Sequence, residues 1–139
     1  MSEGDSVQSR RAPEPVGPYP HARRTGNLLF LSGIGPRVRG SIAVPGVTLD
    51  TMGEVAEYDF ERQCRQVFAN VRTVLDDAGS AWENIIDVTA YLTDLKRDFA
   101  TFNRLYADAF PDHRPTRTTV EVSRLPTPIA IELKVIATI

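Results

Sequence analysis

The chain has 139 residues, of which 42% are hydrophobic and 24% are charged, and this composition suits one globular domain with a real hydrophobic core. The formal net charge is -2 with no block of basic residues, so neither nucleic acid nor an anionic membrane is an expected partner. A single cysteine excludes an internal disulfide bond, and no apolar run reaches the ~20 residues of a membrane span. We therefore expect a cytoplasmic protein.

The N-terminal residues 1–12 are polar, lack the apolar core of a signal peptide and predict a flexible tail. The remaining residues, 13–139, are expected to form a single domain. This domain begins with an extended, turn-rich segment, because four prolines and one glycine fall within residues 13–20.

Two amphipathic helices are predicted by apolar residues that recur at steps of three and four. The first helix spans residues 58–78 and stops before Gly79. Residues 80–83, Ser-Ala-Trp-Glu, match a capping box and predict a short helical turn. The second helix spans residues 99–110. The apolar stripes consist of Phe60, Cys64, Val67, Phe68, Val71, Val74, Leu75 and Ala78 in the first helix and of Phe99, Phe102, Tyr106, Ala109 and Phe110 in the second.

The predicted strands and helices follow one another in the order β-β-α-β-α-β-β. This order predicts an α+β fold, with a single-domain mixed β-sheet and two helices on one face. The last strand has apolar residues on both faces, so the face without helices needs a partner and we expect a homo-oligomer. Strands are predicted at residues 27–32, 42–44, 85–93, 118–122 and 129–137.

Several motifs have simple structural interpretations. Gly33-Ile34-Gly35-Pro36 is similar to a phosphate loop but lacks its third glycine, so a turn at a strand end is preferred, although Gly33 still allows a ligand to approach the backbone. The two histidines, His21 and His113, have no metal-type partner at short spacing, so no metal site is predicted. Cys64 lies on the first apolar stripe, which favours core packing over a nucleophilic role.

Two charged residues occupy the last two predicted strands, where a charge is usually either paired or used. Arg117 is either half of a surface ion pair or a bidentate clamp for a carboxylate. Glu132 lies among apolar residues and is either the ion-pair partner of Lys134 or of an arginine, or a group that polarises a water molecule beside a substrate.

Seven segments are informative together, although each alone is a weak signal. They are residues 17–19 (Gly-Pro-Tyr), 26–33, 63–70, 77–80, 88–94, 99–103 and 114–122 (Arg-Pro-Thr-Arg-Thr-Thr-Val-Glu-Val). In their order and spacing they resemble the YjgF/RidA family of imine and enamine deaminases, and the resemblance extends over residues 15–139.

The resemblance implies a chorismate-mutase-like α+β fold assembled as a homotrimer, with sites between the subunits. It also implies that water deaminates an enamine or imine substrate without a cofactor. Arg117 matches the arginine that binds the substrate carboxylate, and Glu132 matches the glutamate that positions or activates the water; these are the implied catalytic residues.

The implied substrate-binding residues include Tyr19, Gly33 and Asn103, which match pocket positions of the family. Thr119 belongs to the same set but departs from the family pattern, because a cysteine often stands two residues after the arginine. This departure removes a thiol and leaves the arginine–glutamate pair intact.

Pro20-His21 and the long segment of residues 41–53 resemble the 2-aminomuconate deaminase branch of the family. That likeness implies a small dicarboxylate substrate, 2-aminomuconate, which is hydrolysed to 4-oxalocrotonate and ammonia in aromatic-compound degradation. His21 is then either a substrate contact or a surface residue on the proline-rich arm. Two alternatives stay open: a general 2-aminoacrylate-type deaminase, and a non-catalytic ligand-binding trimer.

Overall fold

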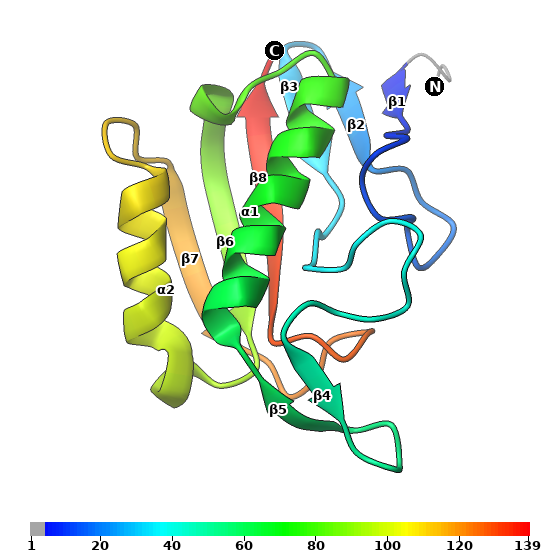
Figure 1. The fold of residues 1–139 in the computed structure, drawn as a ribbon. Helices are drawn as coiled ribbons and strands as arrows, with labels where there is room; N and C mark the ends of the chain where they lie inside the picture. Colours follow the sequence, from blue (N-terminus) through cyan, green and yellow to red (C-terminus); the bar gives the residue numbers. More distant parts are fainter. Residues whose placement is uncertain (1–4) are drawn as a thin grey trace.

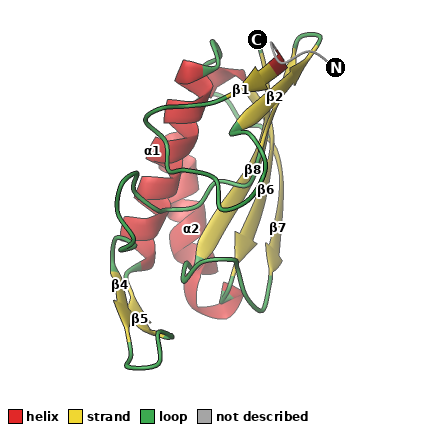
Figure 2. Ribbon diagram, turned by 90° about the vertical axis from the view of Figure 1, so that its right-hand side faces the viewer, coloured by secondary structure: helices red, strands yellow, loops and turns green. Residues whose placement is uncertain are grey.

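One six-stranded sheet carries both long helices on the same face, and no element among residues 5–139, which the computed structural model describes, covers the other face (Figure 2). Strands β6 and β7 are parallel, and all other neighbours are antiparallel. The predicted α+β class and mixed sheet are confirmed. In spatial order the strands are β1 (Ser6–Val7), β2 (Ala22–Thr25), β3 (Leu28–Leu31), β8 (Ile131–Thr138), β6 (Ile85–Leu92) and β7 (Thr116–Glu121), and the helices are α1 (Phe60–Asp77) and α2 (Leu95–Ala109).

Helix α1 forms close to its predicted position because its apolar stripe packs on the sheet. Cys64 and Val67 on this stripe are completely buried. Burial raises the pKa of the Cys64 thiol to about 12, so the thiol stays protonated and packs as an apolar group. Asp59 caps the helix by accepting a 3.1 Å hydrogen bond from the backbone N–H of Arg62. Neither α1 nor any other described helix is long and apolar enough to cross a membrane.

Helix α2 begins at Leu95, earlier than the predicted residue 99. The carboxylate of Asp94 accepts a 3.0 Å hydrogen bond from the backbone N–H of Arg97 and so caps the helix at this point. Phe99 was predicted on the buried stripe, but it is 41% exposed. Leu105, which was not predicted there, is buried instead.

The predicted capping box at residues 80–83 is wrong, although a short helix, η2 (Trp82–Asn84), does form there. No side chain caps η2, because the residue at its N-cap position is Ala81, which has no polar side chain; the hydroxyl of Ser80 donates to the carbonyl of Thr138 at 2.6 Å. This bond ties the segment after α1 to the last strand.

The sheet contains the predicted strands 27–32, 85–93, 118–122 and 129–137 as β3, β6, β7 and β8. Two further strands, β1 and β2, were not predicted. The predicted strand at 42–44 does not form, and a separate hairpin that was not predicted, β4 (Val47–Leu49) and β5 (Val55–Tyr58), follows this segment (Figure 1).

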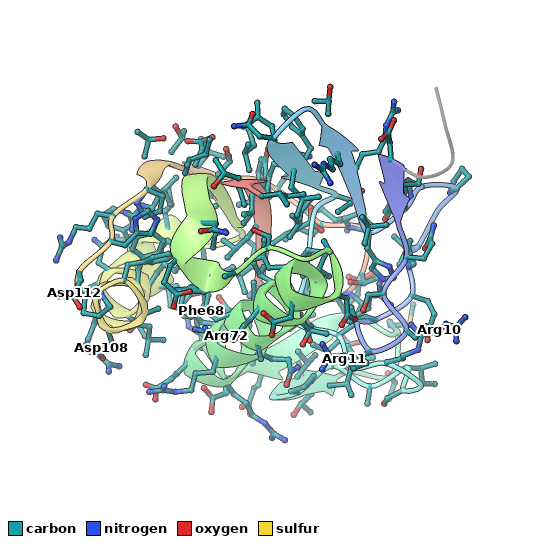
Figure 3. The ribbon with its side chains drawn as sticks, turned by 90° about the horizontal axis from the view of Figure 1, so that it is seen from above. Arg10, Arg11, Phe68, Arg72, Asp108 and Asp112 are labelled. Atoms are coloured by element: carbon teal, nitrogen blue, oxygen red, sulfur yellow. The ribbon has the colours of Figure 1, made fainter. Side chains whose placement is uncertain are left out.

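The predicted flexible tail is too long. Residues 1–4 of that tail lie outside the described residues, but β1 pairs with β2, and Ser9 and Ala12 are buried. The guanidinium of Arg11 lies 2.5 Å from the carboxylate of Asp77 at the end of α1, and Figure 3 shows Arg11 beside this helix. Arg11 and the hydroxyl of Ser9, which donates to the same carboxylate at 2.6 Å, lower the pKa of Asp77. The domain therefore begins within residues 5–12.

Candidate active site

Glu132 lies on the open face of the sheet. Its neighbours along β8, Ile131 and Leu133, are buried on the helix side, so the alternation of the strand turns Glu132 away from the helices. The Glu132 carboxylate lies against Gly33: a Cβ atom added to Gly33 would come within 2.6 Å of Oε2. Only a residue without a side chain leaves this space free.

The Glu132 carboxylate has no hydrogen bond or ion pair with any residue between 5 and 139. Burial raises its pKa, and the nearby guanidinium of Arg37 opposes this rise. Lys134 makes no ion pair with it, and its amine instead donates a hydrogen bond to the carbonyl of Leu31. A half-buried, unpaired carboxylate with a raised pKa accepts a proton more readily than an ordinary glutamate.

A small cavity of about 30 Å³ opens beside Gly33, and Tyr19, Ser32 and Arg37 also line it. This volume holds one or two water molecules but not an organic substrate. The loop that carries Arg37 is held in place by Asn70 of α1, whose amide donates to the carbonyls of Gly35 and Arg37 at 2.9 and 2.7 Å. The loop that forms one wall of the cavity is therefore fixed in place, and the Glu132 carboxylate lies against Gly33 on the cavity lining.

His21 also lines this cavity, but its two ring nitrogens are occupied by the backbone. Nδ1 accepts from the N–H of Ser9 at 3.0 Å, so Nε2 carries the proton and donates to the carbonyl of Pro13 at 2.7 Å. His21 is 4% exposed. The interpretation of His21 as a surface residue is wrong, and neither nitrogen is free for a substrate; its contacts fix residues 9–13 in place.

Arg117 lies on the helix side of β7, at the free edge of the sheet. Its Nη2 donates to Oδ1 of Asn103 on α2 at 2.7 Å. The guanidinium carbon also lies 4.7 Å from the ring centre of Tyr106 and 5.0 Å from that of Phe102. One face of the guanidinium is thus packed on aromatic rings, and one amide fixes its orientation. This is the arrangement expected of a preorganised carboxylate clamp.

Two hydroxyl groups near Arg117 are buried without a hydrogen-bond partner among residues 5–139. They belong to Thr119, two positions along the same face of β7, and to Tyr106. Burial raises the pKa of Tyr106 to about 12, so its hydroxyl stays protonated and can donate. Unpaired buried hydroxyls are costly, and they are suited to meet a polar ligand.

The sheet separates Arg117 from Glu132. In register, Arg117 pairs with Val88 of β6 and Glu132 pairs with Tyr91 of the same strand. Val88 and Tyr91 are three positions apart, so their side chains and those of their partners point to opposite faces. A single chain does not bring the two candidate catalytic residues together.

The chain is similar to known proteins over a range that includes both Arg117 and Glu132. Residues 9–139 match the protein family described as endoribonuclease L-PSP. The chain belongs to the endoribonuclease L-PSP family. A RutC family protein of Pyrococcus horikoshii is 40% identical over 131 residues, 94% of each chain. The chloroplastic Reactive Intermediate Deaminase A of Arabidopsis thaliana is 35% identical over 133 residues, which are 96% of this chain and 65% of the plant protein.

Solved structures of the endoribonuclease L-PSP family share the fold. Escherichia coli TdcF with bound serine has a TM-score of 0.81 at 32% identity, covering 96% of this chain and 98% of TdcF. The Escherichia coli YjgF gene product has a TM-score of 0.80 at 32% identity, with 96% and 97% covered. The resemblance to the YjgF/RidA family is confirmed, whereas the likeness to its 2-aminomuconate branch stays a prediction.

Two residues of the candidate site, Tyr106 and Arg37, were not predicted as site residues. Tyr106 lies one helical turn after Asn103, and this spacing is the signal that would have found it. Arg37 lies in a loop, where no periodic pattern indicates which way a side chain points. Its place beside Tyr19 and Gly33 depends on the bonds from Asn70 to the loop backbone.

Proposed function

We propose that this chain is a cofactor-independent deaminase that hydrolyses the imines of 2-amino acids, in equilibrium with their enamines, to 2-oxo acids and ammonia. The observation that carries the proposal is the unpaired, half-buried carboxylate of Glu132 against Gly33, a residue that itself lines a cavity with room for one or two water molecules. A relative named as a reactive intermediate deaminase supports the same reaction class.

The proposed reaction uses Arg117 and Glu132 in separate roles. Arg117 holds the substrate carboxylate through its guanidinium fork. Glu132 takes a proton from the water molecule as the water oxygen bonds to the imine carbon, and the C=N bond becomes a C–N single bond. The proton then passes to the nitrogen of this carbinolamine. Glu132 next moves the hydroxyl proton of the carbinolamine to the same nitrogen, and ammonia leaves as the C–N bond breaks and the C=O bond of the 2-oxo acid forms.

We place each complete site between two copies of the chain, because Arg117 and Glu132 lie on opposite faces of one sheet. The open face presents Glu132 and Tyr19, and the β7 edge presents Arg117 and Asn103. A closed ring, in which each copy places its β7 edge against the open face of the next, leaves no such surface unpaired. Three copies is the number that the family resemblance implies. The homotrimer is thus part of the proposal.

Mixing two inactive variants tests this arrangement. Arg117→Ala removes one half of every site, and Glu132→Gln removes the other. If the halves come from different copies, trimers unfolded and refolded from an equal mixture regain about one quarter of the wild-type sites, because each intact half is drawn with even odds. Ammonia release from freshly generated 2-aminoacrylate is the measurement.

Refolded wild-type chain and each refolded single variant are the controls. A mixture as inactive as the single variants would refute the shared site. Full activity of either single variant, with an unchanged circular dichroism spectrum, would refute the catalytic role of that residue. A wild-type chain that binds 2-oxo acids yet releases no ammonia from any imine would favour the non-catalytic alternative.

A dicarboxylate such as 2-aminomuconate is the second candidate substrate. Arg37 supports it, because the charge of this guanidinium acts on Glu132 to lower its pKa, and Arg37 lines the cavity with Tyr19 and Gly33. Nη2 of Arg37 donates to the carbonyl of Glu14 at 2.6 Å, which holds the guanidinium in place. With Arg117 on one carboxylate, the other N–H groups of Arg37 can bind the second one.

Arg37→Ala separates the two substrates. For a dicarboxylate enzyme, kcat/KM for 2-aminomuconate falls by about tenfold or more, the worth of one charge-assisted contact, while kcat/KM for 2-aminoacrylate changes little. Arg10→Ala, a change at an exposed arginine, is the matched control. Equal losses for both substrates would leave the general deaminase as the better description.

A further inference from the structure

A second, larger cavity lies on the helix side of the sheet and shares no lining residue with the one beside Gly33. Its volume is about 440 Å³, within the range of small-molecule sites. The β4–β5 hairpin, the starts of α1 and α2, and residues 123–130 surround it; Figure 1 shows the hairpin and the segment after β7 meeting at this end of the molecule. We call it the hairpin cavity.

Gln63, at the wall of the hairpin cavity, carries an unused donor. Its side chain is completely buried, and Oε1 accepts the backbone N–H of Ala130 at 2.8 Å, which sets the orientation of the amide. Nε2 has no hydrogen-bond partner among the described residues. Gln63 and Ala130 both line the cavity. A fully buried amide N–H group needs an acceptor, and a ligand in this cavity is in place to supply one.

Two arginines make the hairpin cavity attractive to anions. Arg97 is held in place: its guanidinium lies 3.8 Å from the ring centre of Tyr58, and Nη2 donates to the Tyr58 carbonyl at 2.8 Å. Asp98, 3.4 Å from Nε, only partly balances the charge of Arg97. Arg124 has no side-chain hydrogen bond or ion pair with residues 5–139. Glu54 is the one carboxylate among the lining residues.

Part of the cavity wall is apolar, which favours a ligand that also has an apolar portion. Residues 125–129 contribute two prolines, Leu125 and Ile129, and proline has no N–H group to offer. The charged donors of the wall are Arg97 and Arg124, and the buried donor without an acceptor is the amide of Gln63. We propose that the hairpin cavity binds a small organic anion, with its carboxylate between Arg97 and Arg124 and an adjacent carbonyl oxygen accepting a hydrogen bond from Gln63.

The probe is 2-oxobutanoate, which combines a carboxylate, an adjacent carbonyl and a short apolar tail. In ¹H–¹⁵N NMR titrations of the full-length chain, the side-chain amide signals of Gln63 shift with added probe. The same shift persists in Arg117→Ala, which lacks the other proposed carboxylate contact. Arg124→Ala weakens this binding by about tenfold, the loss of one charge-assisted contact.

Arg62→Ala is the matched control, because Arg62 is exposed, precedes Gln63 and does not line the cavity. It binds the probe as the wild type does. Gln63 signals that stay unmoved while signals around Gly33 shift would show binding at the candidate active site only and refute the second site. Equal affinity in Arg124→Ala and the wild type would also refute it, and neither result would affect the proposed deaminase reaction.

Discussion

Glu132 lowers the stability of the folded chain at the pH values where its carboxylate is ionised and can act as a base. Because burial raises its pKa in the folded state, the folded chain binds more protons than the unfolded chain between the ordinary glutamate pKa of 4.5 and the raised value. The stability that Glu132 contributes is fully present below pH 4.5 and is lost as the pH rises through the raised pKa. The ionised form, which the proposed reaction needs, is thus the destabilising one.

Glu132→Gln separates these two effects. We expect the variant to lose ~10²–10⁴-fold in kcat, the usual worth of a general base. Its free energy of unfolding relative to the wild type should rise between acid and neutral pH, because the variant has no carboxylate to ionise. Urea unfolding at several pH values and steady-state kinetics on one preparation test both. A pH-independent difference in stability together with full activity would make Glu132 a structural residue.

Gly33→Ala tests the close contact between Gly33 and the Glu132 carboxylate. The added Cβ would lie 2.6 Å from Oε2, so the flexible end of Glu132 must move while the backbone stays in place. We expect a loss of kcat with little change in melting temperature. Gly17→Ala, where the added Cβ would meet the ring of Tyr19 instead, is the comparison. Unchanged kcat in Gly33→Ala would mean that the position of this carboxylate is not critical.

The chemistry of the site could be predicted from the sequence better than its geometry. Glu132 stands out because it places a charge in an apolar strand, and Arg117 because it lies at the start of a short strand flanked by Arg114 and Arg124. Their separation by the sheet could not be predicted, because it depends on the register of both strands against β6. The role of His21 depends likewise on backbone groups of Ser9 and Pro13 that the sequence does not place near it.

At the scale of elements, long periodic segments were predicted and short polar ones were not. Helix α1 and strand β8 follow from their apolar patterns. Strand β2 has two arginines and one threonine and no apolar alternation, so its pairing with β1 and, across Gly26 and Asn27, with β3 makes it a strand. The early start of α2 depends on Asp94, a capping residue outside the apolar stripe.

Asp94→Ala should therefore destabilise the chain by about 1 kcal/mol, the usual worth of a helix cap. The start of α2 should fray, while Asn103, further along the helix, keeps its contact with Arg117. Asp108→Ala makes the same change of charge near the other end of α2, where a negative charge is unfavourable, and should be neutral or stabilising. Thermal melts of both variants are the measurement, and equal losses would argue against a capping role.

For the whole molecule we predict a homotrimer at micromolar concentration. The open face of the sheet carries partly exposed apolar side chains, including Ile86 and Val120, and no described element covers it. Multi-angle light scattering should give three times the chain mass of 15.4 kDa. A stable, active monomer would contradict both the trimer and the shared site.

The rate at which a thiol reagent labels the single buried cysteine measures how often the folded chain opens. Thiol reagents attack the thiolate, and Cys64 has neither exposure nor, with a pKa of about 12, an appreciable thiolate fraction near neutral pH. Labelling of Cys64 therefore requires that the region around α1 open first, and no second thiol contributes background signal. The rate at which one reagent molecule becomes attached to each chain then reports how often the core is exposed, without a dye, a mutation or a denaturant.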